Sequence, residues 1–265
     1  MVTQWSLFSV HDSPSFRLLQ VTDMHLQQDA ETQLKGYNVE QRFQEVMACV
    51  QTEEADLLLL TGDLSHHAPA AYGRISNSLQ QLAFPSAWIP GNHDLLSEMS
   101  NFSEQGYGRK IIELGRWSLL LLDTTSNPDG KGSGSLADSE LDFLIQALDK
   151  RTPEQHVLIV MHHHPVSVES AWQDNIDLAN KDDFWRIVDR YSCVNAVMFG
   201  HVHQQWSLER GQVKLFSTPA TAPQYKARTE RPVVETDTRF RGAAYGRYQL
   251  FDDGNIQAEV IRLPA

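Results

Sequence analysis

The chain has 265 residues and a formal net charge of -12, and its length suits one large α/β domain or two small ones. It carries no run of Lys and Arg, so it lacks the positive surface that drives binding to DNA or RNA, and we expect no nucleic-acid partner. No segment approaches the roughly 20 apolar residues of a membrane-spanning helix, and the first residues lack the pattern of a signal peptide. We therefore expect no membrane partner and a cytoplasmic location.

Apolar runs of strand length alternate with amphipathic helical patterns along the chain. The segments predicted to be buried strands are 16–22, 56–61, 87–90, 117–122, 156–161, 196–199 and 213–216. Apolar residues at helical spacing predict helices over 40–51, 72–82, 141–148 and 182–191. Such alternation is typical of an α/β domain in which two packed sheets carry helices on their outer faces.

Three regions lack this regular pattern. Residues 1–15 are expected to form a short leading strand or a loose arm. Residues 126–135 are rich in Gly and Ser and form a loop, which is either a plain exposed connection or a mobile lid. Residues 218–243 are irregular and rich in Pro, Thr and Arg.

The C-terminal segment returns to strand patterns. Two strands separated by Asp252-Asp253-Gly254 predict a hairpin at about 245–263. The chain shows neither an internal repeat nor a linker long enough to separate two domains. We therefore predict a single domain over 1–265 that ends in this hairpin.

Five short motifs, each placed directly after a predicted strand, hold most of the side chains that can bind a metal. They are Asp23-Met24-His25, Gly62-Asp63, Gly91-Asn92-His93-Asp94, His162-His163-His164-Pro165 and Gly200-His201-Val202-His203. A lone Asp or His at a strand end is usually a cap or a turn residue. Five such motifs at consecutive strand ends instead predict a metal centre with two ions.

The residue types and their spacing narrow the chemistry. Imidazole nitrogens combined with carboxylate oxygens suit Fe, Mn, Zn or Co better than Ca or Mg. Asp23 and His25 are separated by one residue, as are His201 and His203, and in an extended strand each pair would face the same side. The two carboxylate oxygens of Asp63 are able to bridge two ions.

Other histidines near these motifs carry weaker signals. His163 and His164 are expected to pack in the interior or to contact a loop. His66 and His67 follow Asp63 and are expected to be exposed.

Taken together and in this order, the motifs resemble those of the calcineurin-like metallophosphoesterase superfamily, over about residues 16–216. Several details look like the bacterial class III cyclic-AMP phosphodiesterases: segments 22–26, 90–94, 162–165 and 217–221, the triplet Gln224-Tyr225-Lys226, and the terminal hairpin. The resemblance implies the metallophosphoesterase fold, a four-layer αββα sandwich of two mixed sheets flanked by helices.

The resemblance also implies a role for each motif residue. One metal would be held by Asp23, His25, Asp63 and His203. The second metal would be held by Asp63, Asn92, His162 and His201. The phosphate of the substrate would meet His25, Asp63, Asn92, His93, His162 and His203. His93 would be catalytic and assist the leaving oxygen without binding metal, and Asp94 would orient His93.

The implied function is a binuclear-metal phosphodiesterase that hydrolyses 3',5'-cyclic AMP to 5'-AMP through a metal-bridging hydroxide. The implied cofactors are two divalent ions, Fe with Mn or two Mn, with Zn as the alternative. The partner would be a small-molecule cyclic nucleotide, and the chain a monomer or a homodimer. The open alternatives are a broader phosphodiesterase or phosphomonoesterase, acting on 2',3'-cyclic nucleotides or other phosphate esters, a non-catalytic scaffold of the same fold, and a metal-buffering protein.

Overall fold

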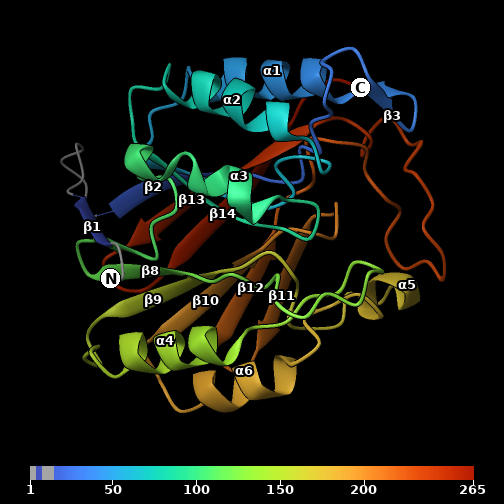
Figure 1. Ribbon diagram of the computed structural model, residues 1–265. Coiled ribbons are helices and arrows are strands. Elements are labelled where there is room, and N and C mark those ends of the chain that lie inside the picture. Colours follow the sequence, from blue (N-terminus) through green and yellow to red (C-terminus); the bar gives the residue numbers. More distant parts are fainter. Residues whose placement is uncertain (1–3, 8–14) are drawn as a thin grey trace.

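The computed structural model describes residues 4–7 and 15–265, and it contains two large β-sheets that lie face to face (Figure 1). The seven-stranded sheet has the order β1-β7-β8-β9-β10-β12-β11. Its strands are β1 (Gln4–Leu7), β7 (Ile111–Leu114), β8 (Trp117–Leu121), β9 (His156–Val160), β10 (Val194–Phe199), β11 (Trp206–Arg210) and β12 (Val213–Ser217). The β8-β9-β10-β12 block is parallel, whereas β7 and β11 are antiparallel to β8 and β12.

The five-stranded sheet has the order β14-β13-β2-β5-β6. Its strands are β2 (Ser15–Val21), β5 (Leu57–Thr61), β6 (Ser86–Ile89), β13 (Ala244–Phe251) and β14 (Ile256–Arg262). The three strands β2, β5 and β6 are parallel, and the C-terminal hairpin β13-β14 adds antiparallel to β2. A two-stranded hairpin, β3 (Gln33–Leu34) with β4 (Tyr37–Asn38), stands apart from both sheets.

Helices cover the outer face of each sheet. In Figure 1, α1 (Val39–Val50) and α2 (Pro69–Leu79) lie over the five-stranded sheet, and α4 (Asp138–Leu148) and α6 (Lys181–Val188) lie over the seven-stranded sheet. The shorter helical segments are α3 (Leu96–Ser100), α5 (Ala171–Asp174) and the 3₁₀ turn Ser103–Gln105. The predicted four-layer sandwich of two mixed sheets is confirmed.

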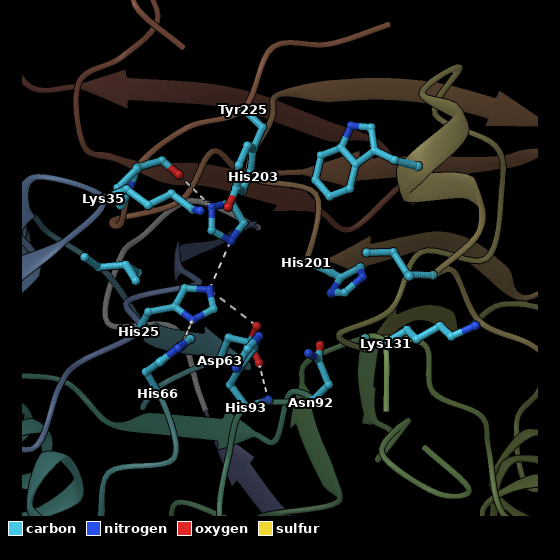
Figure 2. A pocket seen from close by; sticks show the side chains of 15 residues that line it. His25, Lys35, Asp63, His66, Asn92, His93, Lys131, His201, His203 and Tyr225 are labelled. Atoms are coloured by element: carbon cyan, nitrogen blue, oxygen red, sulfur yellow. Dashed lines mark hydrogen bonds and ion pairs between the residues drawn. The ribbon is translucent and has the colours of Figure 1, made fainter. Parts of the chain in front are cut away.

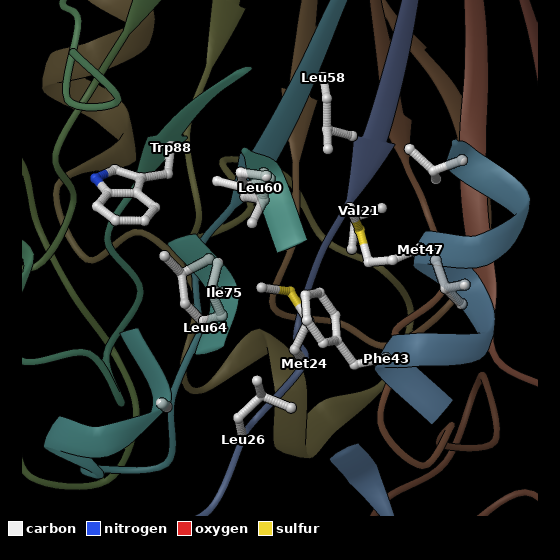
Figure 3. Close-up of a cluster of buried hydrophobic side chains, with 14 of the residues drawn as sticks. Val21, Met24, Leu26, Phe43, Met47, Leu58, Leu60, Leu64, Ile75 and Trp88 are labelled. Atoms are coloured by element: carbon white, nitrogen blue, oxygen red, sulfur yellow. The ribbon is translucent and has the colours of Figure 1, made fainter. Parts of the chain in front are cut away.

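Strand β5 shows why the central strands are apolar on both faces. Leu58 and Leu60 pack toward α1 and α2 with Phe43 and Ile75, in the cluster of Figure 3. Leu57 and Leu59 point the other way, into the core between the sheets. Successive side chains of a strand face opposite sides, so a strand with a packed layer on each side is buried throughout.

The predicted elements are present, with ends shifted by a few residues. Strands β7 and β11 were missed. In β11 the burial alternates between half-buried and exposed, because it is an edge strand paired only with β12. A leading strand, β1, is present within the expected arm, and residues 8–14 lie outside the described part of the chain. Within the described residues, no helix has both the length and the apolar character needed to cross a membrane.

Candidate metal centre

The five motifs meet at one edge of the sandwich, where the carboxyl ends of β2, β5 and β6 come together with those of β9 and β10. Each motif directly follows one of these strands. The side chains converge on a pocket of about 310 Å³, shown in Figure 2. Both sheets therefore contribute to a single site.

The backbone at these strand ends is left-handed and not extended. Asp23, His25, Asp63, His201 and His203 all have positive φ, between 48° and 70°. The expectation that each Asp-x-His or His-x-His pair sits in an extended strand is therefore wrong. His25, His201 and His203 nevertheless line one pocket, and Asp23 lies 4.0 Å from His25. Such strained conformations cost about 1–3 kcal/mol each and persist where surrounding contacts fix them.

Backbone hydrogen bonds between neighbouring strand ends fix this conformation. The amide of Asp23 donates to the carbonyl of Gly62 at 3.1 Å, and the amide of His25 donates to the carbonyl of Asp63 at 2.9 Å. Gly62 itself must lack a side chain, because a Cβ there would collide with the ring of His162.

A first group of ligand atoms lies around Asp23. Its Oδ1 is 3.4 Å from Nε2 of His203 and 4.0 Å from Nε2 of His25. The two imidazole nitrogens are 3.1 Å apart, and Nε2 of His25 is 3.4 Å from Oδ2 of Asp63. All four side chains are buried. Four ligand atoms thus face one small volume.

A second group lies on the other side of Asp63. The same atom, Oδ2 of Asp63, is 3.5 Å from Nε2 of His162. That nitrogen is in turn 3.3 Å from Oδ1 of Asn92 and 3.3 Å from Nδ1 of His201. The two groups therefore share one carboxylate oxygen.

The other oxygen of Asp63 has a different partner. Its Oδ1 accepts a hydrogen bond of 2.8 Å from the amide of His93. The sequence suggested that both carboxylate oxygens of Asp63 take part in bridging. In the structure only Oδ2 faces both groups of ligand atoms, and Oδ1 holds the backbone of the next motif.

Backbone carbonyls set the tautomers of two of the histidines. Nδ1 of His203 is 2.7 Å from the carbonyl of Pro223, and Nδ1 of His162 is 2.8 Å from the carbonyl of Thr61. A carbonyl only accepts, so each Nδ1 carries a proton and each Nε2 is the ring nitrogen that faces the cluster. This is the usual outer-shell arrangement of metal-binding histidines.

The charge and hydrogen bonding of the cluster fit bound cations. Oδ1 of Asp23 is buried and lacks a hydrogen-bond partner among the described residues. Burial opposes ionisation of Asp23, but His203 outweighs it and lowers the pKa of this carboxyl to about 2. Burial likewise opposes ionisation of Asp63, but His162 and His25 outweigh it and hold the pKa of Asp63 well below its usual value. Buried carboxylates and imidazole nitrogens gathered in one small volume are the ligand set of a metal ion.

His93 lies at the pocket wall and pairs with residues of the loop after Asp63. Its Nδ1 is 3.1 Å from Nε2 of His67, and its ring stacks on His66 with centroids 4.5 Å apart. Nδ1 of His66 is also 3.3 Å from Nδ1 of His25. Sequence reasoning placed His66 and His67 as exposed. His67 is exposed, but His66 is half-buried and lines the pocket. Their position within four residues of Asp63 was the available signal.

The predicted contact between Asp94 and the ring of His93 is wrong. Asp94 accepts hydrogen bonds from the amides of Leu64, Ser65 and Gly91 and from the hydroxyl of Tyr72. Burial and the nearby Asp63 carboxylate raise the pKa of Asp94 to about 7. Asp94 thus ties the Asp63 loop to the Gly91 turn, and its carboxylate is occupied by backbone amides and the Tyr72 hydroxyl.

The triple histidine divides into three roles. His162 belongs to the ligand cluster. His163 is buried, with Nδ1 2.7 Å from Oγ1 of Thr124 and Nε2 3.1 Å from the carbonyl of Gly132, so it has the predicted loop contact. His164 is also buried, as expected for interior packing, and its ring lies against Phe199.

The pocket has two parts. Its metal-ligand floor consists of Asp23, His25, Asp63, Asn92, His162, His201 and His203. Five of these line the pocket, whereas Asp23 and His162 are fully buried and contact the other ligand residues. The rim of the pocket consists of Leu34, Lys35, Lys131, Trp172, Ile176 and Tyr225. The sequence identified every floor residue as a candidate, whereas the rim residues come from β3, α5 and loops that lie outside the five metal-binding motifs.

Comparison with known proteins agrees with this geometry. The profile of the calcineurin-like phosphoesterase family matches residues 16–205. The match spans well over half of the chain, and the chain belongs to this family. The family membership predicted from the motifs is confirmed.

Relatives with established names extend over nearly the whole chain. A Haemophilus influenzae protein named 3',5'-cyclic adenosine monophosphate phosphodiesterase CpdA is 34% identical over 258 residues, which cover 95% of this chain and 92% of the relative. A Nostoc protein named 3',5'-cyclic-nucleotide phosphodiesterase alr5338 is 32% identical over 252 residues, covering 93% of this chain and 92% of the relative. The crystal structure of a dimetal phosphatase from Danio rerio superimposes with a TM-score of 0.68 at 13% identity, covering 94% of this chain and 99% of that one. At that identity, the likeness supports the fold alone.

Proposed function

We propose that this chain hydrolyses 3',5'-cyclic AMP to 5'-AMP and that two divalent ions, Fe with Mn or two Mn, are its cofactors. The names of its relatives support the substrate. The observation that carries the proposal is the shared oxygen of Asp63, which lies 3.4 Å from a ligand atom of one group and 3.5 Å from a ligand atom of the other.

In this proposal the floor residues hold the ions. Asp23, His25, Asp63 and His203 hold one ion, and Asp63, Asn92, His162 and His201 hold the second. When bound, the ions lower the pKa of a coordinated water and offset negative charge on the phosphate. The floor orients the phosphate of the substrate, with His25, Asp63, Asn92, His93, His162 and His203 around it.

His93 supplies a proton to the leaving 3' oxygen. Its Nδ1 is paired with His67, so Nε2 is the nitrogen left to meet the substrate. The bond between the His93 amide and Asp63 places this ring next to the floor. Asp94 contributes indirectly, by holding the Asp63 loop against the Gly91 turn.

We also propose that residues 1–265 act as one domain. The core between the sheets combines residues of both, including Leu18 and Leu59 from one sheet and Leu158 and Met198 from the other. The floor draws on both sheets as well, so separating them would divide the site.

Metal analysis coupled to turnover tests the proposal. Protein stripped with a chelator is reloaded with Mn, Fe or Zn, the bound metal is counted, and hydrolysis of 3',5'-cyclic AMP is followed by separating 5'-AMP from 3'-AMP. We expect two ions per chain and 5'-AMP as the product. A higher kcat/KM on 2',3'-cyclic AMP or on aryl phosphate monoesters would replace the proposal with the broader-specificity alternative.

A further inference from the structure

We infer that Trp172 and Tyr225 form the subsite that binds the base of the nucleotide, an inference that rests on the proposed function. Both rings line the pocket. Their centroids are 5.1 Å apart and their planes meet at 69°, so they form a corner. Figure 2 shows Tyr225 on the far side of the cluster from His93, beside His203, and its ring centroid is 5.1 Å from that of His203.

The polar edge of Trp172 is already satisfied outside the pocket. Its indole Nε1 donates to Oγ1 of Thr229 at 3.2 Å. The indole ring therefore offers the pocket apolar carbon surface. A nucleobase stacks well on an indole ring, because every base has a π surface.

The two rings are held in fixed relation to the metal-ligand floor. Gln173, the residue after Trp172, is fully buried and donates to the carbonyl of Val202 at 2.5 Å, between two floor histidines. Pro223, two residues before Tyr225, accepts the hydrogen bond from His203. Trp172 and Tyr225 are thus both anchored to the same Gly-His-Val-His motif, so few side chains need to become ordered when a ligand binds.

The residues around this corner favour a flat apolar group linked to an anion. Ile176 and Leu34 add apolar surface, and Gly132 of the 126–135 loop lies against Ile176. Lys35 and Lys131 bring positive charge to the same pocket. A base attached to a cyclic phosphate matches this combination, whereas a small phosphate ester without a ring would leave the aromatic corner in contact with water.

Substitution of Trp172 tests the inference with two substrates. Trp172→Leu is assayed on 3',5'-cyclic AMP and on 1-O-methylribose 3',5'-cyclic phosphate, which keeps the cyclic diester and lacks the base. We expect KM for cyclic AMP to rise about 5- to 20-fold, the lower part of the range for one lost stacking contact. We expect kcat on cyclic AMP, and both constants on the base-free ester, to change less than about twofold, because the floor is untouched.

Companion variants keep the result interpretable. Trp172→Phe should restore most of the affinity, Tyr225→Leu should raise KM in the same direction, and Phe143→Leu on α4, away from the pocket, should change neither substrate's constants. Equal losses on both substrates, or an unchanged KM for cyclic AMP in Trp172→Leu and Tyr225→Leu, would overturn the inference. Absence of wild-type turnover of cyclic AMP, with turnover of the base-free ester, would instead overturn the proposed function, and the base subsite with it.

Discussion

The floor and the rim of the pocket are built in different ways. Floor residues such as Asp23 and His162 follow the buried central strands, are fully buried, and have backbone partners on neighbouring strand ends. Rim residues such as Lys35, Lys131 and Trp172 come from the β3-β4 turn, the 126–135 loop and the short helix α5, and they are exposed or half-buried. The floor can therefore change little without disturbing two sheets, whereas the rim can change freely.

This contrast separates chemistry from substrate choice. A floor with two groups of ligand atoms around one shared carboxylate suits hydrolysis of many phosphate esters. The rim decides which ester fits above it. A substitution in the catalytic site should therefore lower kcat, whereas a substitution in the rim should raise KM. A single substitution that changed both constants would contradict this division of roles.

The largest effect is expected at the shared carboxylate. Asp63→Ala removes the oxygen common to both groups of ligand atoms, and we expect turnover to fall below detection, with at least one metal lost per chain. Metal counting and steady-state rates on cyclic AMP check this, with Asp142→Ala, an exposed carboxylate on α4, as the control. A variant that kept two metals and the wild-type rate would refute the bridging role.

A large loss of rate without loss of metal is expected at His93. His93→Ala should retain both ions and lower kcat by about 10²- to 10⁴-fold, the usual contribution of a positioned proton donor. His156→Ala, at the opposite end of β9 from His162, is the matched histidine control. If His93→Ala instead lost metal, His93 would belong to the floor as a ligand.

When metal is removed, the ionisable groups of the floor should make the stability of the fold depend on pH. Burial opposes protonation of His162, but the Asp63 carboxylate outweighs it and raises the pKa of His162 to about 9, and the pKa of His203 is also raised, by Asp23 against burial. A histidine whose pKa is higher in the folded than in the unfolded protein stabilises the fold. This stabilisation is complete below the unfolded-state pKa of about 6.5, and it is lost as pH rises through the folded-state pKa.

Chelated protein should therefore melt at lower temperature at pH 9 than at pH 7.5, with at most about 2 kcal/mol lost from His162 over this range. Melting curves across this range check the sign. Histidines with a lowered folded pKa gain stability only until pH passes their unfolded value of about 6.5, so they contribute little change between pH 7.5 and pH 9. His162→Gln in chelated protein should flatten the dependence. A melting temperature that rises with pH in the chelated wild type would contradict the prediction.

A moderate effect is expected at His67, the hydrogen-bond partner of the catalytic histidine. His67→Leu removes the partner of His93 Nδ1, and we expect kcat to fall about 3- to 10-fold, the range for one lost hydrogen bond, while KM and metal content stay constant. His67→Gln, which can place an amide near the same atom, should recover most of the rate. Equal losses in both variants would show that His67 acts only through packing.

The smallest effect is expected from the exposed rim. Lys131→Met removes one solvent-exposed charge, so we expect KM for cyclic AMP to rise about two- to fivefold while kcat stays unchanged. The rise in KM should be smaller at high salt, because salt screens exposed charges. Lys150→Met, exposed at the end of α4, is the control. A loss of kcat in Lys131→Met would mean that the rim takes part in the chemical step and would end the separation drawn above.

The sequence by itself determined the layered α/β fold and the full set of candidate floor residues. Both follow from local rules: strands apolar on both faces, as in β5, require a layer on each side, and chemical motifs directly after parallel strands meet at one edge. The motifs at Asp23 and His201 were informative because each contains two possible ligands within three residues.

Only the tertiary structure decided how those residues are arranged. It determined the left-handed backbone at Asp23 and Asp63, the single oxygen of Asp63 that faces both groups, and the partners of Asp94. It also brought Trp172 and Tyr225 together as the aromatic corner of the pocket. The reason is physical: each of these features depends on atoms from segments tens of residues apart, and local patterns of apolar and polar residues carry no information about such contacts.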